Sequence, residues 1–370
     1  MKNILFVDTG FEYGGGTKSF LYLLEGLTHS QAKYKISVFF EHNYQISDSI
    51  KINDYLKQFN VNIIQNNFSK EKITKWEKEL YRLISKEYLY KKEFNSKLSF
   101  ARKILMLEKF DLIHLNNHFG TNLEYILEAN KLKLPVIQHL RKNSFLNKFQ
   151  IETLKSLKFN TISVSKSTYE FYNLQIPIDE NIIYNPFPFE KDIQHINSKE
   201  IKILMPANYL ENKGHKLVFE ALSKVNRNDI KLYLAGTGKF NSKTEIEKNE
   251  LIKKNRVVEL GFIENLREHY LNSDFIISFS ENEGLPRVVI EGILYGCSII
   301  TSNYKVSYEI QSLLEDKSKY TIIKRDAKIL LDLFTRLEKV DEYRVDCNIQ
   351  SNFSLDTYIK KIESLYKEIL

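Results

Sequence analysis

The chain has 370 residues, of which 43% are hydrophobic and 27% charged, and 54 Lys and Arg against 47 Asp and Glu give a net charge of +7. This composition is typical of a folded protein and excludes long disorder, a collagen-like chain and a continuous coiled coil. The length is sufficient for two domains. No apolar run reaches the roughly 20 residues of a membrane-spanning helix. The first apolar stretch ends at Asp8, too short for a signal sequence, so we expect a cytoplasmic protein.

Short apolar or β-branched runs alternate with longer helical patterns along the chain. The runs that predict strands are 3–8, 35–41, 111–115, 135–139, 161–164, 201–205, 230–235, 257–261, 274–279 and 298–301. Such alternation favours parallel sheets with helices on both faces. Many runs are apolar at every position, as strands buried on both faces require. The sequence therefore predicts an α/β fold with two doubly wound, Rossmann-like domains.

The predicted domain boundary lies near Pro186 and Pro188, which are followed by a polar stretch without periodicity. We expect a first domain over 1–185, a linker over 186–200, a second domain over 201–350 and a C-terminal helix over 351–370. The apolar residues of that helix share one face, so it should dock, and we expect it to cross back to the first domain. Two doubly wound domains in one chain place a ligand cleft between the carboxyl ends of their sheets.

A candidate phosphate site follows the predicted strand 274–279. Gly284 gives a turn and Pro286 suits a first helical turn, so a helix should begin at the sheet edge. Its backbone amides and dipole favour an anion. Glu283 precedes this helix and Glu291 lies about one and a half turns inside it, so one can bind a sugar and the other a ribose diol. Alternatively, Glu283 caps the helix and Glu291 is a solvated helix residue.

This stretch resembles the retaining family 4 glycosyltransferases of GT-B fold. The resemblance rests on the Glu-x7-Glu element at 283–291 and on further elements along nearly the whole chain, and it is strongest from Val257 to Ile310. The further elements are Gly14-Gly15-Gly16, Val164-Ser165-Lys166, Tyr184-Asn185-Pro186, Lys213-Gly214-His215, Ala235-Gly236-Thr237-Gly238 and Glu309.

The resemblance implies a function and a set of donor residues. It implies metal-independent transfer, with retention of configuration, from a UDP- or GDP-linked sugar to a hydroxyl of a glycan or lipid-linked glycan, without a cofactor, in bacterial capsule, O-antigen or lipopolysaccharide synthesis. Glu283 would contact the donor sugar, Lys213 the diphosphate and Glu291 the ribose. The other donor-binding residues would be Gly15, Gly16, Asn208, Gly236, Gly284, Leu285, Pro286 and Arg287.

One residue departs from the family pattern. Asn208 stands five residues before Lys213, where the family usually has an arginine. An amide supplies neither the charge nor the fork of a guanidinium. We expect Arg287 or Lys305 to restore the cation; the alternative is that Lys213 and the backbone amides suffice.

Polar residues also follow two predicted strands of the first domain. His114 lies near the end of 111–115, with Asn116 and His118 directly after it, and His139 ends 135–139, with Arg141 two residues later. Both groups therefore lie at carboxyl strand ends, where doubly wound sheets bind ligands. His118 or His139 would contact the transferred sugar or acceptor hydroxyl, His114 and Asn116 the acceptor, and Arg141 an acceptor phosphate. A histidine at a strand end is more often structural, which is the alternative for each.

Three rival functions share this fold class. A dinucleotide oxidoreductase is disfavoured because the Gly-x-Gly-x-x-Gly fingerprint is absent. A nucleotide-sugar epimerase or phosphorylase stays open, as does a catalytically inactive, membrane-associated binding protein. A zinc site is not expected, because Cys297 and Cys347 are the only cysteines.

Positive charge is concentrated between Lys70 and Lys109, a stretch that contains 12 Lys and Arg but only 6 Asp and Glu. Apolar residues recur there at helical spacing, namely Ile73, Trp76, Leu80, Leu83, Ile84 and Tyr88. This pattern predicts a basic amphipathic helix on the acceptor side, lying on an anionic inner membrane surface rather than on nucleic acid. Alternatively, its apolar face packs on the domain's own sheet.

Overall fold

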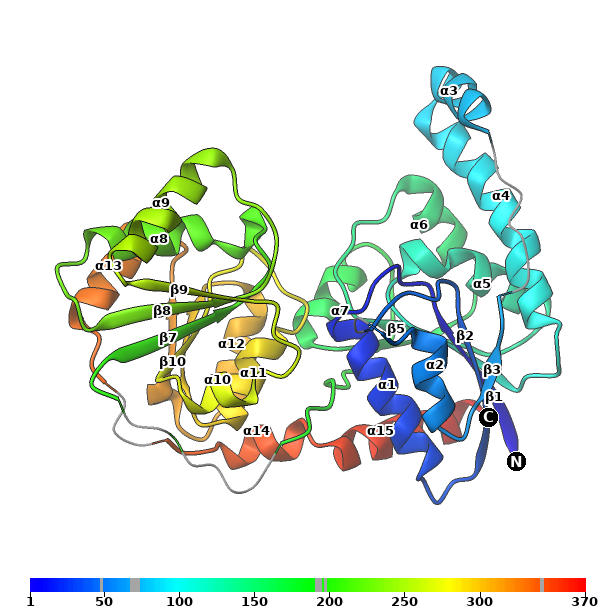
Figure 1. Ribbon diagram of the computed structural model, residues 1–370. Helices are drawn as coiled ribbons and strands as arrows, with labels where there is room; N and C mark the ends of the chain where they lie inside the picture. The colour runs from blue at the N-terminus through cyan, green and yellow to red at the C-terminus, as the bar shows by residue number, and fades with distance from the viewer. Residues whose placement is uncertain (47–48, 67–73, 190–194, 196–197, 340–342) are drawn as a thin grey trace. The chain divides into compact units, whose positions relative to one another are not determined.

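The computed structural model describes the chain except for residues 47–48, 67–73, 190–194, 196–197 and 340–342. It consists of two compact units, each with its own sheet (Figure 1). Unit 1 comprises Met1–Pro186 and Leu355–Leu370, and unit 2 comprises Phe187–Ser354.

Unit 1 has a parallel six-stranded sheet in the order β3-β2-β1-β4-β5-β6. Its strands are β1 (Lys2–Asp8), β2 (Tyr34–Phe40), β3 (Asn62–Ile64), β4 (Leu112–Leu115), β5 (Val136–Leu140) and β6 (Asn160–Ser163). Its helices are α1 (Gly15–Thr28), α2 (Ile52–Tyr55), η1 (Leu56–Gln58), α3 (Lys75–Ile84), α4 (Lys86–Leu105), α5 (Phe119–Lys131), α6 (Lys148–Lys155), α7 (Lys166–Asn173) and α15 (Leu355–Ile369).

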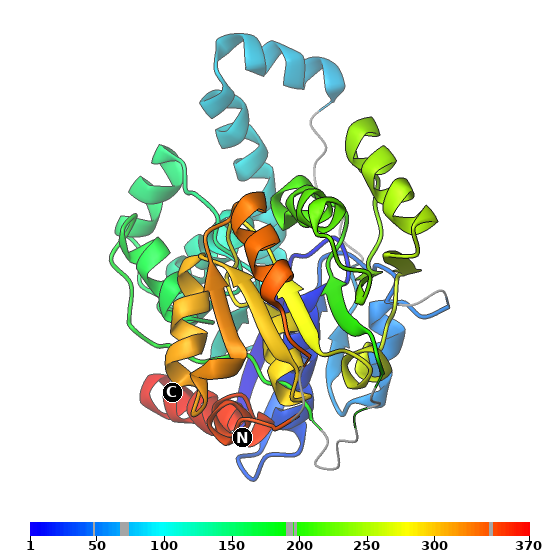
Figure 2. The same ribbon diagram turned by 90° about the vertical axis from the view of Figure 1, so that its left-hand side faces the viewer.

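Unit 2 has the same architecture, with strand order β12-β11-β10-β7-β8-β9 and helices on both sheet faces (Figure 2). Its strands are β7 (Ile201–Pro206), β8 (Ile230–Ala235), β9 (Val257–Gly261), β10 (Phe275–Ser278), β11 (Ser298–Ser302) and β12 (Tyr320–Ile323). Its helices are η2 (Glu211–Lys213), α8 (His215–Lys224), α9 (Ser242–Lys253), α10 (Arg267–Leu271), α11 (Arg287–Leu294), α12 (Lys305–Leu313), η3 (Lys317–Lys319), α13 (Ala327–Arg336) and α14 (Cys347–Asn352).

The predicted pair of doubly wound, Rossmann-like domains is confirmed. Each of the ten predicted strands is present, with ends within about two residues of the prediction. The two strands that the sequence did not indicate, β3 and β12, lie at sheet edges and are partly exposed. Edge strands need not be apolar on both faces, so they lack the pattern that identified the central ones.

The core of unit 1 lies on both faces of its sheet. Alternate residues of β1 belong to two apolar clusters, with Leu5 in one and Ile4 in the other. The C-terminal helix α15 packs against α1 and completes the second cluster. Gly26 of α1 leaves room for Ile359, because a side chain at that glycine would collide with the isoleucine. The C-terminal helix therefore returns to the first domain, as predicted.

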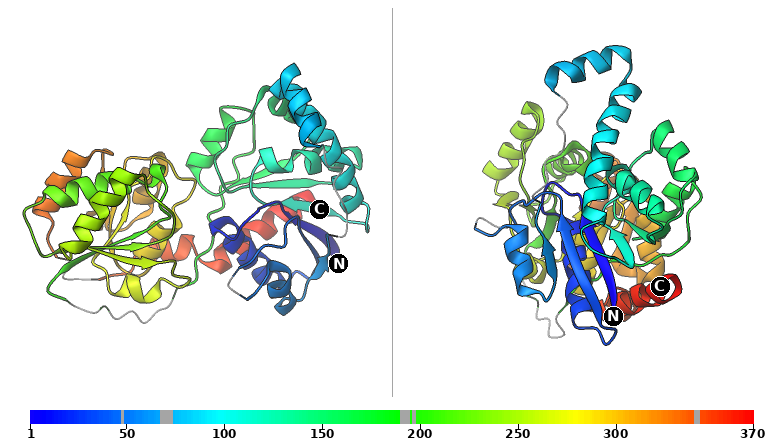
Figure 3. Two further views of the ribbon diagram at one scale, coloured as in Figure 1. Left: turned by 45° about the horizontal axis from the view of Figure 1, so that its top comes forward. Right: turned by 90° about the vertical axis from the view of Figure 1, so that its right-hand side faces the viewer.

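The basic segment forms two helices instead of one. α3 and α4 meet at Ser85, whose extended backbone breaks the helix and whose hydroxyl accepts a 2.9 Å hydrogen bond from the Tyr88 amide. The pair projects from the sheet (Figures 1 and 3). The apolar side chains of α3 do not pack on the sheet, since Trp76 is 74% and Leu83 83% exposed. Ile73 lies outside the described residues. None of the described helices is both long and apolar enough to span a membrane.

Candidate active site

The predicted site residues follow the central strands of each sheet. Strand order reverses between β1 and β4 in unit 1, and between β7 and β10 in unit 2. At such a reversal the loops leaving the two strands diverge and leave room for a ligand. The glycine loop follows β1 and His118 follows β4, while Lys213 follows β7 and Glu283 follows β10.

Lys213 and Glu283 form an ion pair in unit 2. The Lys213 ammonium lies 2.6 Å from Glu283 Oε1, and the Ser280 hydroxyl donates to the same oxygen at 2.7 Å. Both charged side chains keep about a fifth to a quarter of their surface exposed, 24% for the lysine and 20% for the glutamate. The loop needs Gly214, whose φ is +81° and where a Cβ would collide with the Phe279 carbonyl oxygen. The glycine thus brings the lysine loop against the end of β10.

A second pair lies on α11. Arg287 Nη2 donates to Glu291 Oε1 at 3.0 Å, and the Tyr270 hydroxyl donates to Glu291 Oε2 at 2.8 Å. The Arg287 guanidinium also lies 4.3 Å above the Phe187 ring. Pro286 is the N-cap residue, one position before the expected first turn, and no side chain caps this helix start. Gly284 and Leu285 form the loop before it.

Asn208 holds a neighbouring loop in place. Its side-chain oxygen accepts a hydrogen bond from the Thr237 amide at 3.3 Å. Gly236 is required beside it, because a Cβ there would collide with the Ala207 carbonyl oxygen. The asparagine thus joins the loops after β7 and β8.

Arg325 is a further cation near this site, and the sequence pattern did not predict it. It follows β12, and its guanidinium donates to the carbonyl oxygens of Phe279 at 3.1 Å and Glu211 at 3.4 Å. It also lies 3.3 Å from the Glu281 carboxylate. Arg325 therefore clamps the Lys213 loop to the end of β10. The available signal was a basic residue two positions after β12, which the apolar pattern did not reveal. Lys305, the other expected replacement cation, is the first residue of α12.

Arg141 is the centre of a hydrogen-bonded network in unit 1. Its guanidinium donates to the side-chain oxygens of Asn116 and Asn185 and, at 3.2 Å, to the Tyr358 hydroxyl of α15. Asn116 in turn donates to the buried carboxylate of Asp8. Burial raises the pKa of Asp8, opposed by hydrogen bonds from Gly10, Asn116 and Asn117. The sequence indicates Asp8 only as the end of a strand, so this role was not predicted.

Two histidines that were expected to contact a substrate are buried behind Arg141. His114 and His139 have no exposed surface, and their rings are joined by a 3.2 Å contact between His114 Nε2 and His139 Nδ1. Burial, and next the charge of Arg141, lowers the pKa of His114 to about 3 and that of His139 well below its usual value. Asn116 is also fully buried. The two histidines thus match the structural alternative: His139 and Asn116 contact the Arg141 guanidinium from within the fold, and His114 packs behind His139.

His118 caps a helix. Its Nδ1 accepts a 3.1 Å hydrogen bond from the Gly120 amide at the start of α5. Burial, and next the charge of Lys142, lowers its pKa to about 4. The neutral ring therefore carries its proton on Nε2 and can donate a hydrogen bond from that atom.

The glycine loop lies beside Arg141. Gly15 and Gly16 are the first residues of α1, and Gly14 is an N-cap without a side-chain hydrogen bond. A Cβ on Gly16 would lie 3.5 Å from Arg141 Cδ. The helix start and the guanidinium therefore form one positive region in unit 1.

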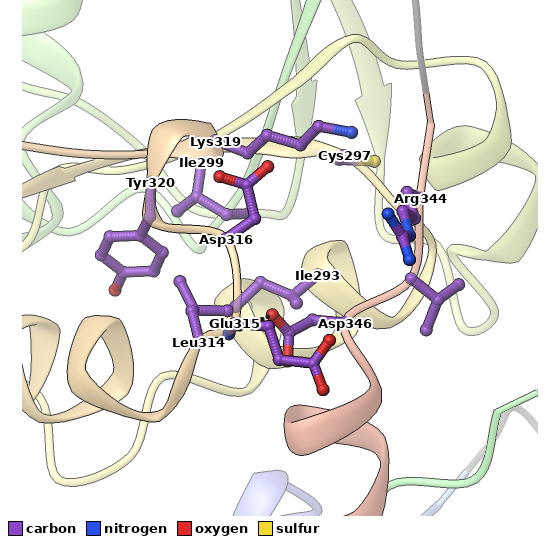
Figure 4. Close-up of a pocket in the computed structure, with 11 residues that line it drawn as sticks. Ile293, Cys297, Ile299, Leu314, Glu315, Asp316, Lys319, Tyr320, Arg344 and Asp346 are labelled. Carbon is purple, nitrogen blue, oxygen red and sulfur yellow. Dashed lines mark hydrogen bonds between the residues drawn. The ribbon is translucent and has the colours of Figure 1, made fainter.

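Other features of the described residues lie elsewhere or are absent. No group of three or more His, Cys, Asp or Glu side chains that could hold a metal ion occurs among them. A cavity of about 250 Å³ lies at the opposite edge of the unit 2 sheet (Figure 4). Its lining includes Cys297 just before β11, Ile299 in β11 and Tyr320 at the start of β12, and no predicted donor residue.

Sequence comparisons connect this arrangement to known proteins. Residues 186–352 match the family described as glycosyl transferases group 1. The chain is 26% identical over 196 residues to the Campylobacter jejuni N-acetylgalactosamine-N,N'-diacetylbacillosaminyl-diphospho-undecaprenol 4-alpha-N-acetylgalactosaminyltransferase, covering 50% of this chain and 53% of that enzyme. It thus spans about half the length of this relative. It is 24% identical over 257 residues to the Staphylococcus aureus capsular polysaccharide biosynthesis glycosyltransferase CapH, covering 64% and 71%.

Solved structures share the fold. The lipopolysaccharide outer core galactosyltransferase WaaB superposes with a TM-score of 0.73 at 15% identity, covering all of both chains. Anabaena HepE in complex with UDP and glucose has a TM-score of 0.68 at 16% identity, covering 99% of this chain and 100% of that chain. These likenesses support two Rossmann-like domains of GT-B type.

Proposed function

We propose that this chain transfers a sugar from a UDP- or GDP-linked donor to an acceptor hydroxyl, with retention of configuration and without a metal. The match of residues 186–352 to the glycosyl transferases group 1 family supports this proposal. The observation that carries the proposal is the Lys213–Glu283 pair. It lies at the carboxyl ends of the central strands β7 and β10 of unit 2, and Glu283 is close in sequence to the start of α11, where no side chain caps the helix. This edge offers a cation, backbone amides and a carboxylate, which are the groups that a sugar diphosphate requires.

The pair is suited to the charges that develop in transfer. The bond from the anomeric carbon to the diphosphate oxygen breaks, a bond to the acceptor oxygen forms on the same face, and the acceptor proton moves to the leaving phosphate. Negative charge grows on the diphosphate, where the Lys213 ammonium and the start of α11 stabilise it. As Lys213 turns to the phosphate, Glu283 is released to accept hydrogen bonds from the sugar. No side-chain nucleophile is needed.

The second pair supports the nucleotide. Glu291 accepts from Tyr270 and Arg287, so its carboxylate is fixed for the two ribose hydroxyls. Arg287 stays on the same helix face, where it supplies the charge that Asn208 lacks.

The acceptor side lies in unit 1. The Arg141 guanidinium, which Asn116 and Asn185 orient, is suited to an acceptor phosphate, whereas Gly15 and Gly16 at the start of α1 are proposed for the donor. The Campylobacter relative is named for a diphospho-undecaprenol acceptor and the Staphylococcus relative for capsular polysaccharide. We therefore propose a lipid-linked glycan of a bacterial surface polysaccharide as the acceptor.

A donor screen tests the function. Thermal unfolding with a panel of UDP- and GDP-sugars should identify a donor that raises the melting temperature. With that donor, product should form only when a glycan acceptor is added, and EDTA should not change the rate. Conversion of the nucleotide sugar without an acceptor would instead indicate an epimerase. No stabilisation by any member of the panel would contradict the proposal.

We further propose that α3 binds an anionic membrane surface. Trp76, Leu80, Leu83 and Ile84 form an exposed apolar face. The opposite side of α3 faces α4, through the ion pair of Lys78 with Glu93 and the ring contact of Tyr81 with Tyr88. Residues 75–105 contain nine Lys and Arg against four Glu. An exposed apolar face on a basic helix pair is complementary to an anionic lipid interface.

Liposome sedimentation tests this membrane proposal. The protein should sediment with vesicles that contain phosphatidylglycerol at low salt, and rising salt should release it. Trp76→Ser should weaken sedimentation, whereas Leu174→Ser, at another exposed apolar site of unit 1, should not. Sedimentation that is the same with neutral and anionic vesicles, and the same for wild type and Trp76→Ser, would contradict the membrane proposal.

A further inference from the structure

An exposed aromatic ring lies in the loop that joins β1 to α1. Phe11 is 73% exposed, although its ring stacks on the His42 imidazole with centroids 4.3 Å apart and planes at 27°. His42 follows β2, the parallel neighbour of β1. Both rings therefore lie at the carboxyl edge of the unit 1 sheet, the edge that carries Arg141.

The backbone that carries the two rings is fixed. The Gly10 amide donates to the Asp8 carboxylate at 2.6 Å, and the Glu41 amide donates to the Asp8 carbonyl oxygen at 2.9 Å. His42 Nε2 lies 3.4 Å from Glu41 Oε1. One face of Phe11 thus stacks on the His42 imidazole while most of the ring remains in water, where its apolar surface costs free energy.

The loop that carries the ring contacts a residue that holds Arg141. The Cβ position of Gly10 lies 3.8 Å from Asn117 Nδ2. The Asn117 carbonyl oxygen accepts a 2.8 Å hydrogen bond from the Arg141 amide. The loop that carries Phe11 therefore runs alongside the residues that hold Arg141.

We propose that Phe11, supported by His42, is a stacking platform for a pyranose ring of the acceptor glycan. A pyranose has a face of C–H bonds surrounded by hydroxyls, and stacking that face on an aromatic ring removes apolar surface of both partners from water. The surroundings of the platform are polar, since Glu12 is exposed and His42 is half-buried. A single ring with polar neighbours fits one sugar better than a protein or a bilayer, which need a broad apolar patch. The assignment to the acceptor rests on the proposed function.

Saturation-transfer NMR tests the platform with simple sugars. The probes are methyl β-D-glucopyranoside and methyl α-D-galactopyranoside, and sorbitol serves as the acyclic control. We expect saturation of the pyranose C–H protons by the wild-type protein and little for sorbitol. Phe11→Ala should reduce the pyranoside signal about fivefold, whereas Phe11→Trp should retain it. Leu174→Ala, which removes an apolar residue that is 83% exposed at the end of α7, should leave it unchanged.

Two results would overturn the platform: no saturation of either pyranoside by the wild type, or equal saturation by wild type and Phe11→Ala. Thermal stabilisation by UDP- and GDP-sugars, measured on the same samples, separates this failure from failure of the proposed function. If a donor stabilises the protein but Phe11→Ala changes nothing, only the platform fails. If Phe11 governs pyranoside binding while no nucleotide sugar stabilises the protein, the platform stands as a carbohydrate site and the transferase proposal fails.

Discussion

The two units have the same strand order, but their charged side chains differ in burial at the carboxyl ends of the central strands. In unit 2, Lys213 pairs with Glu283, and both remain partly exposed. In unit 1, the fully buried side chains of Asn116 and His139 contact the Arg141 guanidinium, and Asn116 donates in turn to the buried carboxylate of Asp8. A partly exposed pair can exchange one partner for a ligand, whereas a buried network fixes one geometry. We infer that unit 2 is built for chemistry and unit 1 for positioning.

The largest expected effect comes from the exposed pair. Glu283→Gln keeps the shape of the side chain but removes the charge opposite Lys213, so we expect turnover to fall by about 100-fold or more, as for loss of one preorganised group. Nucleotide release with the identified donor measures this effect.

Lys213→Ala should have a similar effect on turnover. Lys216→Ala, which removes an exposed lysine from the adjacent helix α8, is the matched control and should be silent. Equal losses of turnover in Lys213→Ala and Lys216→Ala would show that turnover depends on the overall positive charge and not on the Lys213–Glu283 pair.

The three histidines of unit 1 with lowered pKa values predict that acid destabilises this unit more than unit 2, although the raised pKa of Asp8 acts in the opposite direction. Burial lowers the pKa of His114 to about 3, that of His118 to about 4, and that of His139 well below its usual value. In unit 2 the pKa is lowered for His215, to about 4, and for His195. A depressed folded pKa gives stability that is present above the unfolded value of about 6.5 and is lost as pH falls toward the folded pKa, at up to about 1.4 kcal/mol per pH unit for each histidine.

Hydrogen exchange between pH 7 and 4.5, corrected for intrinsic rates, measures this difference. Protection of β1 and β4 should fall more steeply than protection of β7 and β10. Parallel slopes in the two units would contradict the role assigned to the buried histidines.

Arg325 sharpens the comparison, because it positions the exposed pair without belonging to it. Arg325→Lys keeps the charge but loses the fork that reaches Phe279 and Glu211. We expect turnover to fall about tenfold with little change in global stability. A large drop in the melting temperature of Arg325→Lys, accompanying the loss of turnover, would instead indicate a purely structural role.

The smallest effect is expected at Tyr358. Tyr358→Phe removes the hydroxyl that accepts from Arg141 at 3.2 Å, at a cost of about 1 kcal/mol in the free energy of unfolding. Urea unfolding followed by fluorescence measures it. Tyr169→Phe, at a partly buried tyrosine of α7, is the control. An unchanged midpoint for Tyr358→Phe would show that α15 does not support Arg141.

The central strands and the charged loop of unit 2 could be predicted from the sequence, because strands buried on both faces have continuous apolar runs and the loops after them carry the polar residues. The burial of His114 and His139 could not be predicted, since a histidine at a strand end looks the same whether it points into the core or outward. Arg325 and Tyr358 were missed because their partners lie 46 and 217 residues away in the chain, and local patterns do not report such distant pairings. The sequence predicted the amphipathic character of α3. It did not predict that the helix ends at Ser85, where the chain turns into α4 and leaves the apolar face of α3 exposed.

The central claim is that the exposed edge of unit 2 binds the sugar diphosphate. Calorimetric titration with UDP or GDP, whichever nucleotide the donor screen identifies, tests it most directly on wild type, Lys213→Ala and Lys216→Ala. The account predicts that Lys213→Ala raises Kd at least about tenfold, the equivalent of about 1.4 kcal/mol, while Lys216→Ala binds as wild type. Unchanged nucleotide affinity in Lys213→Ala would contradict it.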